Sequence, residues 1–346
     1  MDCAWYSYVM TVATHSRKTG ELLSAELEGV NQILPHMHPW AWQLYLDGAA
    51  NNWMPTEVPM ATDIANWPKL SDDERLVVKR NLGFFAGSES LVANNLFALA
   101  KHVTDPECRQ YMARQQYEEC LHNHTIVYIC DSLDLNINEV YEAYENIPSI
   151  KAKDDFLMRA TSDLNRPDFN TLTLQGKREL YKGAFVYWVI CEGILFYSGF
   201  AMLLSMSDRV PGIAEQIQYT LRDESLHIKF GTNLLNTLRK QYPDIMTDAF
   251  EEELTKLVKE AVALEIQYAK DVLPRGILSL NSEMFVDYMQ YIGNRRLEGL
   301  SMKYRFDSDK NPFPWLAEKI DIQKQKNFFE TRVTDYASAS VLEDDF

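Results

Sequence analysis

Two Glu-x-x-His motifs, far apart in the chain, constrain the fold more than any other feature of this sequence. The spacing places a carboxylate and an imidazole on the same face of an α-helix, one turn apart. Each motif follows, at near-equal distance, a single glutamate in an otherwise apolar segment. The six residues are Glu89, Glu119 and His122 in the first set, and Glu192, Glu224 and His227 in the second. Because an unpaired charge in an apolar interior is very costly, these groups must find partners.

The repeated arrangement is typical of helical bundles that hold two iron or manganese ions between carboxylates. Four carboxylates and two neutral imidazoles carry four negative charges, which two divalent cations would balance. Without cations the crowded carboxylates would repel one another, and some would take up protons. Oxygen-rich ligation with a little imidazole suits iron and manganese better than copper or structural zinc.

A solvated helix face is the ordinary explanation for any single glutamate, and one Glu-x-x-His motif is a weak signal. The segments LGFFAGSESLVANNLF around Glu89 and VICEGILF around Glu192 offer no polar face broad enough for that explanation. Two motifs, each with such a glutamate before it, therefore make a strong signal for a dinuclear metal site. Glu118, His124 and Glu215 lack this context. We interpret these three as surface groups or as supports of the ligands.

The composition excludes several classes of protein. The 346 residues allow one large domain or two, and a hydrophobic content of 46% is enough for a substantial core. A formal net charge of −16 argues against a non-specific nucleic-acid binder, which needs a basic surface. The five cysteines form no Cys-x-x-Cys motif, so we expect reduced thiols in a cytoplasmic protein. The N-terminus has no evident signal peptide.

Helical periodicity and cap signals predict an all-α protein without a sheet. Residues 71–74, Ser-Asp-Asp-Glu, form a capping box that opens a long helix through Glu89. The expected helices are 39–55, 71–102, 104–131, 136–148, 150–161, 183–207, 211 onward, 244–272 and 281–300, with a loop at 162–172. The expected divisions are an N-terminal segment (1–35), a dimetal helical domain (36–305) and a partly flexible tail (306–346).

One segment raises the question of a membrane span. Residues 183–206 are 24 in number, carry the single charge of Glu192, and by length could cross a bilayer. We favour a buried core helix, because the carboxylate falls near the middle and the sequence holds no second such segment. The chain is therefore not expected to be a membrane protein. A lone carboxylate in such a segment is a functional candidate under either interpretation.

The sequence resembles the small, radical-generating subunit of class I ribonucleotide reductase over roughly residues 36–346. The resemblance rests on NNWMPTEVPM, GFFAGSESLVANN, YEECLHNHT, EGILFYSGF, LRDESLH, the NPFPW block and the C-terminal tail. It implies a ferritin-like bundle with a dinuclear metal-carboxylate site between four helices. It also implies a cytoplasmic homodimer that activates oxygen and supplies an oxidising equivalent to a large subunit, which reduces ribonucleotides to deoxyribonucleotides.

The resemblance also implies roles for individual residues. The ligands would be Glu89, Glu119 and His122 at one ion and Glu192, Glu224 and His227 at the other. The relay that carries the oxidising equivalent would use Trp53, Asp223 and His122, and then Tyr336 in the tail. Asp223 is suited to accept a hydrogen bond from metal-bound His122, which orients the ring. The terminal LEDDF resembles the peptide that docks on the large subunit.

Two positions depart from the usual pattern of this family. Glu89 stands where most members have Asp, and Ile126 stands where most carry the radical-storing Tyr, four residues after His122. An aliphatic side chain holds no stable radical, and Tyr128 faces elsewhere on the helix. Both departures resemble subclass Ic, in which a manganese/iron pair stores the oxidising equivalent on the metal itself. We therefore expect Mn and Fe, with a di-iron pair (Fe2) as the alternative.

Two other functions compete with this interpretation. A ligand-binding oxidase similar to the small subunit (R2-like) would use the same kind of manganese/iron site on a bound fatty acid. That function has no use for a tail tyrosine or an acidic docking end. A non-catalytic metal-storage or interaction protein would take up many iron atoms per molecule, or none, and would form no oxidised centre.

Overall fold

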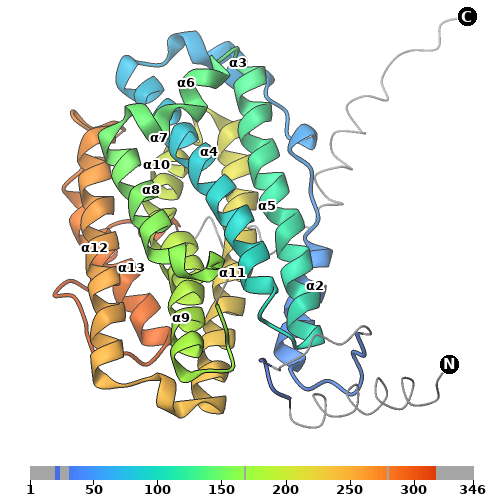
Figure 1. Ribbon diagram of the computed structural model, residues 1–346. Coiled ribbons are helices and arrows are strands. Elements are labelled where there is room, and N and C mark those ends of the chain that lie inside the picture. The colour runs from blue at the N-terminus through green and yellow to red at the C-terminus, as the bar shows by residue number, and fades with distance from the viewer. Residues whose placement is uncertain (1–19, 24–30, 167–168, 279, 317–346) are drawn as a thin grey trace, which may run out of the picture.

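Helices form nearly all of the regular structure (Figure 1) in the computed structural model, which describes residues 20–23, 31–166, 169–278 and 280–316. Within these ranges there is no strand, only an isolated bridge between Ile277 and Leu280, so the all-α prediction is confirmed. The elements in sequence order are α2 (Pro39–Ala50), η1 (Pro55–Glu57), α3 (Ala61–Asn66), η2 (Trp67–Lys69), α4 (Asp72–Ala100), α5 (Pro106–Ser132), α6 (Ile137–Tyr141), α7 (Ala143–Asn146), α8 (Pro148–Thr161), η3 (Ser162–Asn165), α9 (Leu174–Ala184), η4 (Phe185–Leu195), α10 (Tyr197–Ser205), α11 (Pro211–Gln241), η5 (Pro243–Ile245), α12 (Asp248–Val272) and α13 (Met284–Gly299).

The two helices that carry the first set of candidate ligands begin at well-formed caps. The Ser71 hydroxyl accepts a hydrogen bond from the Glu74 amide at 3.2 Å, and the Glu74 carboxylate accepts one from the Ser71 amide at 2.7 Å. At the start of α5, the Asp105 carboxylate accepts a hydrogen bond from the Cys108 amide at 2.9 Å. These bonds satisfy amide groups that have no partner within the first turn, and they fix where each helix starts.

The long apolar stretch is not one α-helix. It divides into α9, a π-helix (η4) and α10, and every side chain of the π-helix is buried. Residues Leu174–Ser205 are apolar and long enough to cross a membrane, but 94% of their most apolar window is buried inside the fold. This burial agrees with the core helix that we favoured from the sequence. The π-helix itself was not predicted.

The helices that carry candidate ligands pack against one another. Helix α4 lies along α5, and the π-helix packs against α11 on one side and α12 on another. Helix α2 covers the outer side of α5, and α8, α12 and α13 cover the side of the bundle away from it (Figure 1). The apolar side chains of all these elements form one continuous core.

The beginning of the predicted tail packs on the bundle. The Phe313 ring is fully buried against Phe285 and Tyr288 of α13, at centroid distances of 5.1 and 4.8 Å. The Asn294 carboxamide accepts a hydrogen bond from the Phe306 amide at 2.7 Å. Residues 317–346, and most of the N-terminal segment 1–35, lie outside the described residues.

Candidate metal centre

Four helical elements bring the six candidate ligands into one buried cluster. Glu89 comes from α4, Glu119 and His122 from α5, Glu192 from the π-helix, and Glu224 and His227 from α11. All six side chains are at most 1% exposed. The two imidazole rings lie 5.9 Å apart between centroids. The i, i+3 spacing of each motif accounts for this convergence, because it points the Glu and the His of one helix at the same neighbour.

The ligand atoms form two overlapping groups. Glu89, Glu119, His122 and Glu224 offer atoms within 4.8 Å of one another, and so do Glu119, Glu192 and His227. Glu119 belongs to both groups. Glu224 also faces both imidazoles, with one oxygen 3.1 Å from Nδ1 of His122 and the other 3.3 Å from Nδ1 of His227. Both carboxylates thus lie between the two imidazoles, where the two groups meet.

Several atoms of the cluster form no hydrogen bond, although carboxylate oxygens lie 3.1–3.6 Å from Nδ1 of His122. One oxygen each of Glu89, Glu119, Glu192 and Glu224 is buried without a hydrogen bond, and so are both ring nitrogens of His122. Buried polar atoms normally have a partner, so unpaired atoms that converge on one point call for an ion. Carboxylate oxygens and imidazole nitrogens are the donor set that iron and manganese take. The residues present thus fit a dinuclear centre.

The pKa values of the cluster residues also favour a site for cations. Burial raises the pKa of Glu89 to about 8. Burial, with repulsion from Glu224, also raises the pKa of Glu192 well above its ordinary value. Burial alone would lower the pKa of His122 and His227, but the surrounding carboxylates raise both well above the ordinary value. Protons thus hold positions in the metal-free protein that cations would take.

The π-helix places Glu192 at the cluster. Two cationic side chains from outside bind its backbone: Lys153 Nζ donates to the Leu195 carbonyl at 3.0 Å, and Arg296 Nε donates to the Gly193 carbonyl at 2.8 Å. Lys153 is fully buried and pairs with Glu265. π-Helical turns are rare and are frequently found at functional sites. These two contacts hold the unusual backbone next to the ligand.

Behind each imidazole lies an acid from the helix of the other motif. Nε2 of His122 lies 3.6 Å from the Asp223 carboxylate of α11, and the same oxygen of Asp223 accepts a hydrogen bond from the Trp53 indole at 2.7 Å. Nε2 of His227 lies 2.9 Å from the Glu118 carboxylate of α5. Such contacts orient metal-bound imidazoles and raise their basicity. Trp53 is buried and hydrogen-bonded to Asp223, whereas His122 Nε2 lies within ion-pair distance of that carboxylate without a hydrogen bond.

From the sequence, Glu118 was either a surface group or a support of the candidate ligands, and the structure places it as a support. It lies fully buried, and Arg114 donates to its other oxygen at 2.8 Å. The available signal was the acid directly before the ligand glutamate in both motifs, Glu118 before Glu119 and Asp223 before Glu224. Of the other two groups set aside with Glu118, Glu215 accepts a hydrogen bond from the Tyr219 hydroxyl at 2.9 Å. His124 is half-buried on α5.

The position of the usual radical tyrosine holds a buried aliphatic side chain, and another phenol lies nearby. Ile126 is 2% exposed, and Tyr128 points away to donate to the Val58 carbonyl at 3.1 Å. The hydroxyl of Tyr187, on the π-helix, lies 3.3 Å from a carboxylate oxygen of Glu119. Sequence reasoning missed Tyr187, because only the π-helical backbone turns it towards the cluster.

Gln115 joins these groups into one hydrogen-bond network. Its amide nitrogen lies 2.9 Å from Glu192, 3.1 Å from Glu119 and 3.2 Å from the Tyr187 hydroxyl. Its amide oxygen accepts a hydrogen bond from the Trp188 indole at 3.0 Å. The network fixes one carboxylate oxygen of Glu119 and one of Glu192, and the other oxygen of each forms no hydrogen bond. Tyr336, the proposed last step of the relay, lies outside the described residues.

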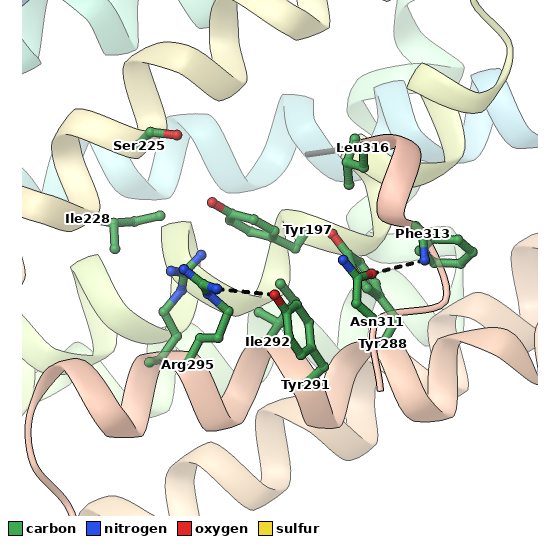
Figure 2. Close-up of a pocket in the computed structure, with 11 residues that line it drawn as sticks. Tyr197, Ser225, Ile228, Tyr288, Tyr291, Ile292, Arg295, Asn311, Phe313 and Leu316 are labelled. Atoms are coloured by element: carbon green, nitrogen blue, oxygen red, sulfur yellow. Dashed lines mark hydrogen bonds between the residues drawn. The ribbon is translucent and has the colours of Figure 1, made fainter. Parts of the chain in front are cut away.

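The cluster is separate from a surface cavity of about 290 Å³ between α11, α13 and the segment that follows it. Figure 2 shows its lining, in which Arg295 donates to the Tyr291 hydroxyl at 3.1 Å and Tyr197 points into the space between them and α11. None of the six candidate ligands lines this cavity. The cluster therefore does not open into this cavity.

Comparison with known proteins gives one consistent result. The family model described as ribonucleotide reductase, small chain, matches residues 30–312. The ribonucleoside-diphosphate reductase subunit beta of Chlamydia pneumoniae is 50% identical over 93% of this sequence and 94% of its own length. The ribonucleoside-diphosphate reductase small chain of Nicotiana tabacum is 28% identical over 90% of this sequence and 89% of its own length.

Solved structures agree in fold. A putative class I ribonucleotide reductase from Bacillus halodurans superimposes with a TM-score of 0.74 at 26% identity, over 81% of this protein and 99% of that one. The R2 subunit from Clostridium botulinum gives a TM-score of 0.80 at 23% identity, over 87% of this protein and 94% of that one, which supports the ferritin-like bundle. With a family model that covers most of its length and a half-identical relative, the chain belongs to the small-chain family of ribonucleotide reductase.

Proposed function

We propose that this chain is the small subunit of a ribonucleoside-diphosphate reductase, active only together with a large subunit. The observation that carries the proposal is the buried cluster of four glutamates and two histidines, in a protein half identical to a named beta subunit. With two redox-active ions bound, the centre would supply the oxidising equivalent that the large subunit uses to reduce ribonucleotides. The fatty-acid oxidase alternative is not favoured, because the curated relatives are reductases.

The residues of the protein divide the work of holding and connecting this centre. The six ligands bind the ions, while Asp223 and Glu118 fix the two imidazoles. Apolar neighbours such as Ile126 keep water away from the cluster. Trp53 and Asp223 link His122 towards the outside of the bundle, and the indole packs on the Tyr219 ring at 5.2 Å. The relay would continue through Tyr336 to the large subunit. The acidic C-terminus of this protein would bind that subunit.

Manganese and iron are the metals that we propose, with a di-iron pair as the alternative. Two observations support a centre that stores the oxidising equivalent itself, as in subclass Ic: a glutamate, Glu89, at the first ligand position, and Ile126 in place of an oxidisable ring. A homodimer in the cytoplasm follows from the family resemblance. Light scattering on the purified protein tests whether it is a dimer.

Replacing one tail tyrosine tests the relay. Tyr336→Phe removes an oxidisable phenol and leaves the cluster untouched, so the variant should bind metal and form the oxidised centre normally. Reduction of ribonucleotides with the large subunit should be lost. Tyr144→Phe, at a tyrosine that is 41% exposed, is the matched control and should keep full activity. Undiminished turnover by Tyr336→Phe would remove Tyr336 from the proposal.

A further inference from the structure

A second set of oxidisable rings reaches the cluster by a route separate from Trp53. Trp53 connects to His122 through Asp223. Trp188, on the π-helix, connects instead to Glu119 and Glu192, because its indole donates to Gln115 at 3.0 Å and Gln115 donates to both carboxylates. Trp188 is fully buried. An electron-rich indole thus lies one hydrogen-bonded residue away from two ligands.

From Trp188 the route leads outward to a partly exposed tryptophan. The Trp188 ring lies 5.3 Å from the Phe230 ring, and Phe230 lies 5.6 Å from the ring of Trp40, between centroids. Trp40 stands at the start of α2 and is partly exposed to solvent. Indoles lose one electron within the range of biological oxidants, whereas a phenyl ring does not. Phe230 is therefore a spacer that keeps the two indoles within short reach.

Close packing fixes the position of the Trp188 ring. A Cβ atom added at Gly231 of α11 would lie 2.1 Å from the Trp188 Cβ, so a side chain there would displace the indole. Tyr111 also stacks on Phe230, at 4.3 Å, but its buried hydroxyl has no hydrogen-bond partner. A phenol gives up an electron readily only when its proton has an acceptor. The oxidisable steps are therefore the two tryptophans.

We propose that Trp188 and Trp40 form a discharge route, by which an oxidised metal centre that is not used by a large subunit is reduced from the surface. This inference rests on the proposed function, since it needs a centre that becomes oxidised. Trp188 gives one electron to the centre and keeps its indole proton, which stays hydrogen-bonded to Gln115. Trp40 then gives one electron to Trp188 across Phe230 and loses its indole proton to water. A one-electron reductant in solution, such as ascorbate, returns an electron to Trp40, which takes a proton back from water.

The Tyr187 phenol is the natural competitor for the first step. It lies 5.0 Å from the Trp188 ring, and its hydroxyl is 3.3 Å from Glu119. Its oxidation would need transfer of the phenol proton to a carboxylate that the ions also bind. The indole needs no such transfer. Tyr187→Phe therefore separates the two candidates, because a decay slowed by this variant and not by Trp188→Phe would assign the first step to the phenol and overturn the indole route.

The experiment uses the full chain loaded with Mn(II) and Fe(II), exposed to oxygen, with no large subunit present. The decay of the oxidised centre is followed by optical and electron paramagnetic resonance spectroscopy, with ascorbate added. Trp188→Phe should slow the decay several-fold. Trp40→Phe, at a partly exposed site that tolerates the change better, should do the same. Trp67→Phe is the control, because Trp67 directly follows α3 at the opposite end of the bundle from the start of α2 (Figure 1).

A second readout does not depend on activity. Without ascorbate, peptide mass spectrometry should find oxygen added to Trp40 in the wild-type protein and not in Trp188→Phe. Metal analysis checks that each variant loads both ions. Decay at the wild-type rate in both tryptophan variants, or an unmodified Trp40, would overturn the route while the proposed function stands. Failure of the loaded wild-type protein to form any oxidised centre would overturn the proposed function and the route with it.

Discussion

Loading the metal-free protein with two divalent ions should release about four protons, because the cluster replaces protons by cations. Glu89, whose pKa burial raises to about 8, holds a proton at pH 7. Glu192, His122 and His227 have raised pKa values as well, and each must lose a proton to bind an ion through its lone pair. The pKa of Glu119 is lowered, since the neighbouring imidazoliums outweigh its burial, so it contributes none.

The sign of the pH dependence follows from the same groups. A ligand with a raised pKa competes for protons below that pKa, so metal affinity should fall as the pH falls. Each proton that must leave changes the affinity by about tenfold per pH unit. Titration calorimetry of Mn(II) or Fe(II) binding in buffers of different ionisation enthalpy counts the released protons. Glu89→Gln, which removes one of the proton-holding ligands, should lower the count by about one.

Two results would refute this reasoning. A count near zero would mean that the ligands are already ionised, and that the raised pKa values of the buried carboxylates and imidazoles do not describe the metal-free protein. An unchanged count in Glu89→Gln would mean that Glu89 carries no proton to release. Either result would leave the six-ligand geometry standing and remove its charge balance.

Two further outcomes test storage on the metal and the support of the π-helix. Protein loaded with Mn(II) and Fe(II) should bind both metals, as measured by elemental analysis. After oxygen exposure it should show no tyrosyl-radical doublet by electron paramagnetic resonance. A doublet that Tyr187→Phe abolishes would instead place storage of the oxidising equivalent on that phenol. Lys153→Met leaves Glu265 buried without its partner, so metal-free protein should lose about 3–5 kcal/mol in urea unfolding. Lys151→Met, at an exposed i, i+4 pair with Asp155, should cost no more than about 0.5 kcal/mol, and equal losses in both variants would contradict the role of the buried pair.

The parts of the fold that could be predicted are those with local signals. The capping box at Ser71 forms both of its hydrogen bonds, and the predicted helix 71–102 agrees with α4 to within two residues. The convergence of six candidate ligands followed from spacing on a helix face, and the structure places all six in one cluster. The short helices were harder, since the predicted helix 136–148 is two helices with a break at Glu142.

The rest depended on contacts that a sequence does not display. Apart from Glu192, the residues of η4 form no polar face, so no periodicity distinguishes a π-helix from an α-helix there. The register of Glu192 and Tyr187 depends on that backbone. Lys153 of α8 donates a hydrogen bond to the Leu195 carbonyl in that π-helix, although the two residues are 42 positions apart in sequence. Side chains that meet across helices, such as Gln115 and Trp188, had no sequence signal of their own.

The two acids that face the imidazoles, Glu118 and Asp223, each lie on the helix of the other motif. This crossed arrangement gives a specific prediction. Glu118 lies on α5 beside Glu119, but it holds His227 of α11, at the other end of the cluster from His122. Glu118→Gln removes the negative charge behind that imidazole and should weaken binding of the ion beside His227, by about tenfold or more. The ion beside His122 should be affected much less.

Asp223→Asn is the mirror-image variant, because Asp223 lies on α11 and faces His122 of α5. It should weaken the ion beside His122 and spare the other. Stepwise metal titrations of the two variants resolve the two ions by their separate binding steps. If each substitution instead weakened the ion held by the histidine on its own helix, the acids would act through the adjacent glutamates, Glu119 and Glu224. If both steps weakened equally, the substitutions would act through general loss of structure. Only a crossed pattern requires that each helix complete the ligand set of the other, which is why α5 and α11 must pack in one register for either ion to bind.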